Sequence, residues 1–370
     1  MALTAYGVNA NEAVKLWSKR LFIEVLKFSN FAAYMGVTTD DMLVVQEETS
    51  KGPGDRVRVI LARLLTGAGV AGDTTLEGNE EQLSTFTQDL LIDQLRHGVR
   101  SAGQMSEQRI PFSIREQAMA RLADWWTDRL DVCIANQLCG NTGQGDLRYT
   151  GNNAALAPST ATNNNRIIFP DSTNTTETLV QTNKVTHQLT HIDRALSAAK
   201  TAAPFMRPLK TSRGNVFVYF MHPNTSRDLQ TNATQGQVAW YPMAIAAMTG
   251  GKIEGNPLGL TPGGGDIFSR ALGVYKNCVL TENYRIPTTP SQTVDAAGGL
   301  SYRNVLCAAQ AGIVAFGQRY GNRRMSWKEK LFDYDNQLGV KAGIIFGITK
   351  AQFNGIDYGT IVLPVYAQQL

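Results

Sequence analysis

A helical pattern that runs without interruption over residues 114–139 constrains this sequence most. Ser113 and Glu116 have the spacing of a capping box at its start, and Gly140 follows its last residue. A helix of about 26 residues is about 39 Å long, so the sequence predicts one long helix that forms the backbone of a domain. The apolar residues that recur at helical spacing are Ile114, Ala118, Leu122, Trp125, Leu130, Cys133, Ile134 and Leu138.

Before this helix, two strand-like segments enclose a glycine-rich and acidic stretch. We predict a strand over residues 54–65, a tip over residues 66–81 and a returning strand over residues 85–99. At about 3.4 Å per residue the first arm would span about 40 Å, and an isolated two-stranded ribbon is marginally stable in water. The hairpin is therefore expected to lie on another surface.

The tip contains Gly67, Gly69 and Gly72 in the G-x-G-x-x-G spacing of a dinucleotide site. Such a site needs the third glycine to lead into a helix whose backbone amides face the pyrophosphate. Here the chain breaks again at Gly78, and acidic side chains that would repel phosphate follow Gly72. We therefore predict a mobile hairpin tip and no nucleotide cradle.

The rest of the chain indicates a mixed α+β protein. Residues 141–183 are rich in Asn, Thr and Ser and are predicted to form a loop or linker. Helices are expected over residues 13–34 and 185–202 and from Pro223, and strands over residues 216–221, 274–280, 304–316, 339–348 and 361–366.

Composition and charge exclude several classes of protein. The 370 residues are 43% hydrophobic and 18% charged, which is ordinary for a globular chain. A net charge of +4, from 35 basic and 31 acidic residues, is too small for a protein that grips DNA through a polycationic surface. We expect no signal peptide, because no basic and then apolar pattern opens the sequence, and no membrane span, because no apolar run reaches about 18 residues.

No motif predicts a catalytic, cofactor or metal site, so we expect no enzyme. His187 and His191 have i, i+4 spacing, but Gln188 stands where a zincin needs glutamate. The apolar stripe of the predicted helix places both histidines on its opposite, solvated face. The four cysteines lack metal-binding spacing and are expected to be reduced, mostly buried thiols. They are Cys133, Cys139, Cys278 and Cys307.

Five stretches before Gly140 carry a resemblance to a known family. In order they are Trp17-Ser-Lys-Arg-Leu-Phe, Leu64-Leu-Thr-Gly-Ala-Gly-Val-Ala-Gly-Asp, Thr75-Leu-Glu-Gly-Asn-Glu-Glu, Ile92-Asp-Gln-Leu-Arg-His and Met105-Ser-Glu-Gln-Arg. They are similar to the major capsid proteins of N-four-like tailed phages, which have the Hong Kong-97 capsid fold. The resemblance implies a division of the chain into an N-terminal arm and helix (1–51), an extended-loop hairpin (52–100), a peripheral domain with the long spine helix and the Asn/Thr-rich loop (101–184), an axial domain (185–335) and a return to the peripheral domain (336–370).

The function that the resemblance implies is a major capsid protein that self-assembles into the icosahedral shell around phage double-stranded DNA. Such a protein assembles in the host cytoplasm and resides in the virion capsid. A cargo-holding nanocompartment shell of the same fold is the nearer alternative, and a nucleotide-dependent enzyme that uses the three glycines is the other. Expected partners are further copies of the chain in pentamers and hexamers, a portal, a cement protein, enclosed DNA contacted non-specifically and a separate scaffolding protein, since the first predicted helix begins near residue 13.

The hairpin tip is expected to contact a neighbouring subunit, because shell subunits need elements that become buried across neighbours. The densest basic cluster of the chain contains Arg323 and Arg324, and we predict that it meets the acidic tip between subunits. Two separately solvated patches are the alternative. The tip residues expected at the interface are Leu65, Gly67, Val70, Asp73, Leu76, Glu77, Glu80 and Glu81.

Overall fold

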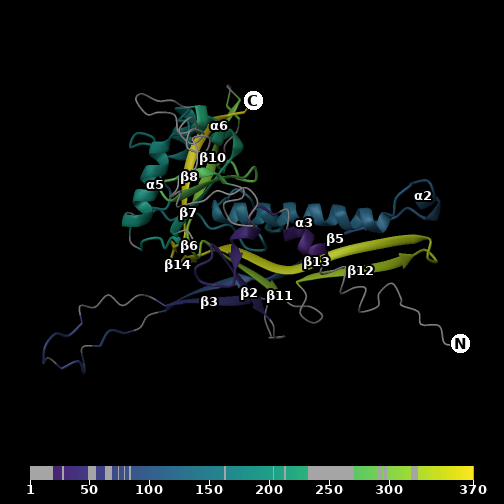
Figure 1. The fold of residues 1–370 in the computed structure, drawn as a ribbon, viewed down its shortest axis with the longest axis horizontal. Coiled ribbons are helices and arrows are strands. Elements are labelled where there is room, and N and C mark those ends of the chain that lie inside the picture. Colours follow the sequence, from purple (N-terminus) through teal and green to yellow (C-terminus); the bar gives the residue numbers. More distant parts are fainter. Residues whose placement is uncertain are drawn as a thin grey trace, which may run out of the picture.

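A long helix and two six-stranded sheets organise the protein, so the expected mixed α+β class is confirmed. Figure 1 shows helix α3 (Ile114–Leu138) running along the first sheet, with the second sheet beside the C-terminal end of the helix. The computed structural model describes residues 20–26, 29–48, 56–62, 69–73, 75–78, 80–82, 85–161, 164–202, 204–211, 214–231, 271–290, 294–295, 298–317 and 324–369.

The first sheet is built around the long strand β13 (Gln337–Lys350). One edge of β13 pairs with β11 (Gly312–Gly317) and β12 (Met325–Phe332), and the other edge pairs with β5 (Asp93–Arg100). Strand β2 (Leu43–Glu48) lies parallel to β11, and the short β1 (Met35–Gly36) completes the sheet. Helix α3 packs on β13 through a large apolar core, in which the Trp126 ring meets Phe346 edge to face.

The long helix begins at Ile114 as predicted, and differs from the prediction at its last residue and in its N-terminal cap. It ends at Leu138, one residue before the expected end, and Ser113 is its N-cap with extended backbone angles. The Ser113 side chain, however, makes no capping hydrogen bond, so the expected capping box is wrong. Packing of the apolar face against β13 therefore stabilises this helix more than its first turn does.

The second sheet has strand order β16-β10-β7-β9-β8, with β6 (Leu209–Thr211) also on β7. Strand β7 (Gly214–Met221) is central, as expected. Its even-numbered residues Val216, Val218 and Phe220 join the core beneath α3, while Phe217 and Tyr219 join a second core. Strand β7 thus holds two cores together. The other elements are α5 (Leu189–Thr201), α6 (Pro223–Thr231), β8 (Ala271–Tyr275), β9 (Cys278–Glu282), β10 (Gly299–Cys307) and β16 (Thr360–Gln368).

Two expected strands are each split in the structure. Residues 274–280 form the hairpin of β8 and β9, because Lys276 and Asn277 adopt positive φ and reverse the chain. Residues 304–316 contain the end of β10 and most of β11, which lie in different sheets. The two sheets do not follow the expected domain boundary at residue 335. Strand β12 precedes this boundary but pairs in the first sheet with β13, whereas β16 follows it but pairs in the second sheet with β10. The naming of domains stays a prediction.

The link between β10 and β11 is tied to the rest of the protein at every residue. The backbone N–H groups of Ala308, Ala309, Gln310 and Ala311 donate to the carbonyl oxygens of Gly359, Arg207, Asp41 and Met42 respectively. A β-carbon on Gly359 would lie 2.5 Å from the Ala311 Cα, so glycine permits this close approach. The chain therefore passes between the two sheets through a fixed connection.

The first expected helix is shorter than predicted. Residues 20–26 are helical, but residues 29–31 are not, and Ala32–Tyr34 forms the 3₁₀ helix η1. Ser29 Oγ donates to Asp131 Oδ1 at 2.6 Å, and the Asn30 backbone N–H donates to Asp131 Oδ2 at 2.9 Å. The Asp131 carboxylate of α3 therefore holds residues 29 and 30 in a non-helical conformation, although the sequence there still has a helical pattern. The start of the expected helix lies outside the described residues.

The Asn/Thr-rich stretch forms a polar brace, although it has little regular structure beyond η2 (Leu147–Tyr149) and α4 (Glu177–Thr182). Gln137 of α3 donates to the carbonyl oxygens of Thr150 and Asn153. Asn153 in turn accepts from the Leu91 N–H and donates to the Leu91 carbonyl oxygen. Side-chain amides thus replace an apolar core here, and they tie α3 to β4 (Thr85–Leu91).

The expected solvated histidine pair is wrong, because both rings are buried. His187 precedes α5 and lies 2.7 Å from the Tyr219 hydroxyl, while His191 Nδ1 accepts from the Gln188 backbone N–H. Burial lowers the pKa of His187 well below its usual value and that of His191 to about 4. In the described ranges, no group of three or more His, Cys, Asp or Glu residues could hold a metal ion.

The four cysteines are free and buried, as expected. Burial raises the pKa of the Cys133 and Cys139 thiols to about 12, so they stay protonated at neutral pH. Among the helices that the structure describes, none has the length and apolar character needed to cross a membrane.

A fully buried ion pair links the end of β13 to the short strand β15 (Ile356–Asp357), which precedes β16. Lys350 Nζ at the end of β13 lies 2.9 Å from Asp357 Oδ2, and neither side chain is exposed. The carboxylate also accepts from the Ser159 N–H and from Gln352 Nε2, and Lys350 donates to the Ala157 carbonyl oxygen. Burial lowers the pKa of Lys350, so these oxygen acceptors are what keep its charge tolerable inside the protein.

Asp357→Ala should lower the free energy of unfolding by about 3 to 5 kcal/mol, because it leaves the Lys350 ammonium buried without its counter-charge. Chemical denaturation of the unassembled subunit measures this. The matched control is Asp124→Ala, which breaks an exposed pair with Arg121 and should cost less than about 1 kcal/mol. Equal losses in the two variants would contradict the importance of the buried pair.

The stability of the subunit should fall as the pH drops from 6.5 to about 4. In this window an unfolded chain binds protons at His187 and His191 that the folded chain does not, so the free energy of unfolding decreases with falling pH. The loss for His191 is about 3 kcal/mol at the lower end of the window. Denaturation across this range measures the slope, and His191→Gln should make it shallower; an unchanged slope would contradict the assignment.

Candidate functional site

A two-stranded ribbon with an acidic tip is the most distinctive surface feature of the protein. Strands β3 (Arg56–Ala62) and β4 pair antiparallel, with Val57 opposite Leu90 and Ala62 opposite Thr85. The expected hairpin is therefore confirmed over these residues. The returning strand is interrupted after Leu91, however, and its second half, β5, pairs with β13 in the first sheet.

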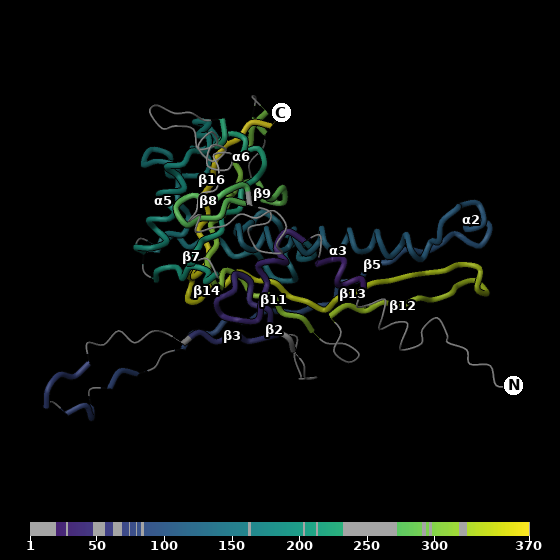
Figure 2. The backbone as a smooth tube through the Cα atoms, in the orientation of Figure 1, coloured from purple at the N-terminus to yellow at the C-terminus, as the bar shows by residue number. Residues whose placement is uncertain are grey.

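The ribbon is anchored to its own subunit along one face. Val57 and Leu90 are buried in a small core with Ile313 and Phe353. Gln88 donates to the Lys350 carbonyl oxygen at 2.8 Å and accepts from the Gln352 N–H. Val59, Leu61 and Phe86 pack against the same core, whereas Ile60, on the opposite face of the strand, is 65% exposed. Figure 2 shows the ribbon and the coloured tip segments extending away from both sheets. The outward face of the ribbon and the described residues of the tip are therefore the parts that its own subunit leaves exposed.

The described residues of the tip form turns and irregular structure, and none of them is helical. Gly69, Gly72 and Gly78 have positive φ, and nothing lies within 4 Å of where their β-carbons would be. These glycines therefore turn an open chain and form no cradle at a helix N-terminus.

The tip brings together most of the expected interface residues. Asp73, Glu77, Glu80 and Glu81 are exposed, as is Leu76, and Val70 is half-buried. The Gly78 N–H donates to Glu80 Oε2 at 2.7 Å, which shapes the turn. Leu65, Gly67 and Arg323 lie outside the described residues.

Arg324 lies away from the tip, at the start of β12. Its guanidinium group is 5.3 Å from the centre of the Phe22 ring and 5.2 Å from that of Phe316. Cation–π attraction of this kind holds the side chain against helical residues 20–26 of its own subunit. Its expected contact with an acidic tip stays a prediction.

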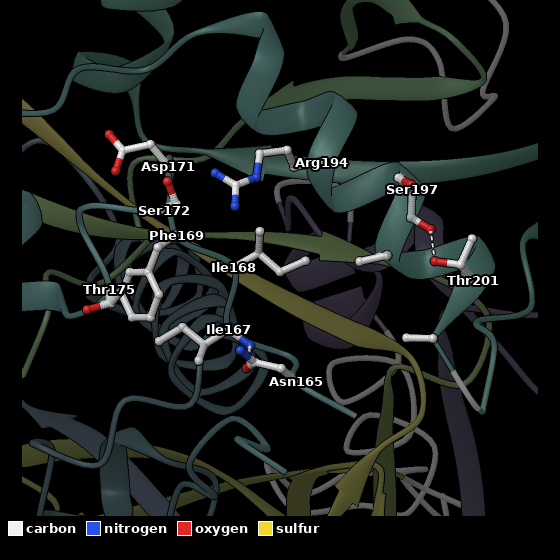
Figure 3. Close-up of a pocket in the computed structure, with 12 residues that line it drawn as sticks. Asn165, Ile167, Ile168, Phe169, Asp171, Ser172, Thr175, Arg194, Ser197 and Thr201 are labelled. Carbon is white, nitrogen blue, oxygen red and sulfur yellow. Dashed lines mark hydrogen bonds between the residues drawn. The ribbon is translucent and has the colours of Figure 1, made fainter. Parts of the chain in front are cut away.

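A cavity of about 580 Å³ lies between residues 165–175 and α5. Figure 3 shows Asp171 and Arg194 at one side of it and Ile167 and Ile168 at its floor. Arg194 donates to the Pro170 carbonyl oxygen, and Asp171 accepts from the Asn174 N–H, which holds the pKa of Asp171 below its usual value. The charged groups of the cavity thus fix the backbone of residues 170–174.

Sequence reasoning missed the residues that anchor the ribbon. The Gln88 and Asn153 side chains hydrogen-bond to backbone groups at the base of the ribbon. Gln88 bonds to Lys350 and Gln352, and Asn153 bonds to Leu91. An amide among many in an Asn-rich stretch carries no periodic signal. Only the folded contacts distinguish Asn153 from its neighbours.

Comparison with known proteins points in a single direction. The sequence model of the family described as phage capsid protein matches residues 5–367. The major capsid protein of Pseudomonas phage KPP25 is 28% identical over 391 aligned residues, which cover 98% of each protein. The capsid of Ralstonia phage GP4 superposes with a TM-score of 0.74 at 27% identity, covering 100% of this chain and 99% of that chain. The capsid of cyanophage Pam1 shares the fold, with a TM-score of 0.68 at 20% identity and coverage of 92% and 93%.

These matches confirm the Hong Kong-97-type capsid fold expected from the sequence. They also confirm the expected function, a major capsid protein that forms the icosahedral shell of a phage, and its place in the virion capsid. Since the family match extends over nearly the whole chain, this protein belongs to the phage capsid protein family.

Proposed function

We propose that the chain encloses phage double-stranded DNA as a structural subunit, without catalysis, and that its ribbon and acidic tip bind a neighbouring subunit. The observation that carries this proposal is the ribbon itself, which packs one face on its own subunit through Val57 and Leu90 but exposes Ile60 on the other face and Leu76 at the tip. Apolar side chains on a projecting ribbon are stabilised when another surface covers them. In a shell, the neighbouring copy supplies that surface.

The assembly follows from repetition of a modest contact. A tip that binds a different surface on the next copy makes a heterologous contact, and such contacts close into rings when the rotation between copies permits. Pentamers and hexamers of this chain are rings of that kind. Because each subunit in a shell binds several neighbours at once, weak individual contacts give a cooperative container.

The remaining partners in the proposal follow from the same role. A portal admits the DNA, a separate scaffolding protein guides assembly, and a cement protein reinforces the outer surface. The enclosed DNA is contacted non-specifically, in keeping with a net charge of only +4. In this proposal the ribbon is the extended loop, α3 is the spine helix of the peripheral domain, and the sheet around β7 belongs to the axial domain.

Replacing residues 67–81 with a two-residue Asn-Gly turn tests the role of the tip. The thermal melt of the unassembled subunit should stay nearly unchanged, because the tip buries little of the subunit's own core and a tight turn suits the flanking strands. Shell formation, measured by sedimentation and electron microscopy, should fail, because the shortened ribbon no longer reaches its neighbour.

A control variant keeps the length of the tip but replaces residues 67–81 with Gly and Ser, which separates loss of reach from loss of side chains. Extraction of the contents of wild-type particles distinguishes nucleic acid from protein cargo. Normal and equally stable shells from the shortened variant would contradict the proposal, as would a collapsed melt of its subunit.

A further inference from the structure

One side of helix α3 carries a long groove. Near the N-terminal half of α3, a cavity of about 490 Å³ lies between this helix and the helical residues 20–26. A second cavity of about 540 Å³ lies farther along α3, beside Tyr284 and Arg285. The two cavities meet at Asp124, which lines both of them, and we call them together the α3 groove.

The length of the α3 groove suits a helical partner. The groove follows α3 from Glu116 to Asp131, which at 1.5 Å per residue is about 22 Å. A helix of about four turns has the same length. Amphipathic helices bind in grooves of this kind by laying their apolar face on the floor of the groove.

Apolar and aromatic side chains contribute to the floor of the α3 groove. Met119 and Ala123 line the first cavity, and Trp125 and Tyr284 line the second. Ala120 is exposed within the first cavity, where its small side chain leaves room for a partner. Because Tyr284 is 59% exposed, part of this apolar surface lies open in the isolated subunit and would be stabilised by a covering partner.

The rim of the α3 groove is acidic, although the protein as a whole has a net charge of +4. Five acidic residues line the two cavities, against two basic ones. Arg285 contacts the Asp128 carboxylate, so one of the two basic residues is neutralised within the groove. The acidic residues are Glu24, Glu116, Asp124, Asp128 and Asp131, and the basic ones are Arg20 and Arg285.

Glu116 and Asp124 are the carboxylates that a partner would meet. Both are exposed, and they lie on the same side of α3, about two helical turns apart. Asp124 forms an exposed ion pair with Arg121, which contributes little and can exchange for another cation. By contrast, the Asp131 carboxylate is buried and bonds to the subunit's own chain. The open part of the groove therefore offers negative charge above an apolar floor.

The charge of the α3 groove selects among the partners of a shell subunit. Carboxylates repel the phosphates of enclosed DNA, and they also repel the acidic tip of a neighbouring copy. A basic amphipathic helix complements both the charge of the rim and the apolar floor. Because exposed ion pairs are weak and screened by salt, such a contact can form at every subunit and still be released. A protein that guides assembly and then departs needs a contact of this kind.

We propose that the α3 groove binds a basic amphipathic helix of the scaffolding protein. The apolar side chains of that helix pack on Met119 and Trp125, and its lysine or arginine side chains lie at Glu116 and Asp124. This inference rests on the proposed function, which includes a scaffolding protein among the partners, and it assigns that protein a surface on the subunit. Complementary charge at such a contact favours the correct partner and orientation.

A designed peptide tests the chemistry of the α3 groove. The probe is a labelled helical peptide of about 15 residues that carries Leu at positions i, i+3, i+4 and i+7 and Lys elsewhere. Fluorescence anisotropy measures its binding to the unassembled full-length subunit. Glu116→Lys with Asp124→Lys should weaken binding by about tenfold, because like charges then meet in the groove. Ala120→Trp should weaken binding by about the same factor without a change of charge, because the larger side chain occupies the groove.

Matched controls separate the groove from general attraction between opposite charges. Asp93→Lys with Glu107→Lys changes the net charge by the same amount outside the groove, and should leave the affinity within about twofold of the wild type. A peptide with Glu in place of Lys should not bind. Thermal melts verify that each variant folds. If the charge variant of the groove does not fold, Ala120→Trp provides the second test of the same surface.

Production of the subunit together with the scaffolding protein of its phage tests the assignment to that partner. Particles of the Glu116→Lys, Asp124→Lys variant should contain about tenfold less scaffolding protein than particles of the wild type, because the charge complementarity is lost at every subunit. Densitometry of purified particles measures this content. Particles of the Asp93→Lys, Glu107→Lys variant should keep it within about twofold.

The outcomes separate this inference from the function on which it rests. Groove-dependent binding of the peptide, together with loss of scaffolding protein, supports the inference. Absent peptide binding overturns it, as do peptide binding that the groove variants do not weaken and a normal scaffolding content in their particles. Loss of shells by the groove variant without any scaffolding protein also overturns it and assigns the groove to a contact between copies. If shortening the tip abolishes shells while the groove variant assembles normally with its partner, only this inference fails; if shortening the tip has no effect, the proposed function fails.

Discussion

The buried contact between Lys350 and Asp357 is the constraint on which the arrangement of the protein depends. Lys350 ends the longest strand of the first sheet, and Asp357 lies just before the strand β16 of the second sheet. A charge in this position is tolerated only if its partner and the surrounding oxygen acceptors are all in place. Residues 157–159 bond to both members of the pair, since the Ala157 carbonyl oxygen accepts from Lys350 and the Ser159 N–H donates to Asp357, so the pair also fixes this segment.

The ribbon depends on this junction as well. Gln88 at its base bonds to the Lys350 backbone, and Leu91 is held by Asn153 from the polar brace. A projecting element needs a rigid base if its outer end is to reach a neighbour at a defined place. In this hairpin, polar contacts hold the base in place, and the exposed apolar and acidic residues of the tip are left available for a neighbour.

Local sequence patterns predicted the elements whose apolar spacing reflects their packing. They gave wrong predictions where a contact with a residue far away in the sequence determines the local structure. The long helix and strand β7 were predictable because apolar spacing over residues 114–139 and 216–221 reflects their packing directly. The first helix was overextended because Asp131, far away in sequence, captures Ser29 and Asn30. His187 was placed in solvent because its partner Tyr219 lies on another element. The tip was predictable from its composition, whereas Gln88 and Asn153, which anchor the ribbon, carry no periodic signal.

The connection at residues 308–311 determines how the subunit responds to force. Its four N–H groups bond to three separate segments, at Gly359, at Arg207 and at residues 41–42, so the connection between the two sheets is rigid. A load applied to one sheet is therefore transmitted to the other through this connection. In a shell built from such subunits, differences in local curvature would then be accommodated at the contacts between subunits and not at the connection between the two sheets.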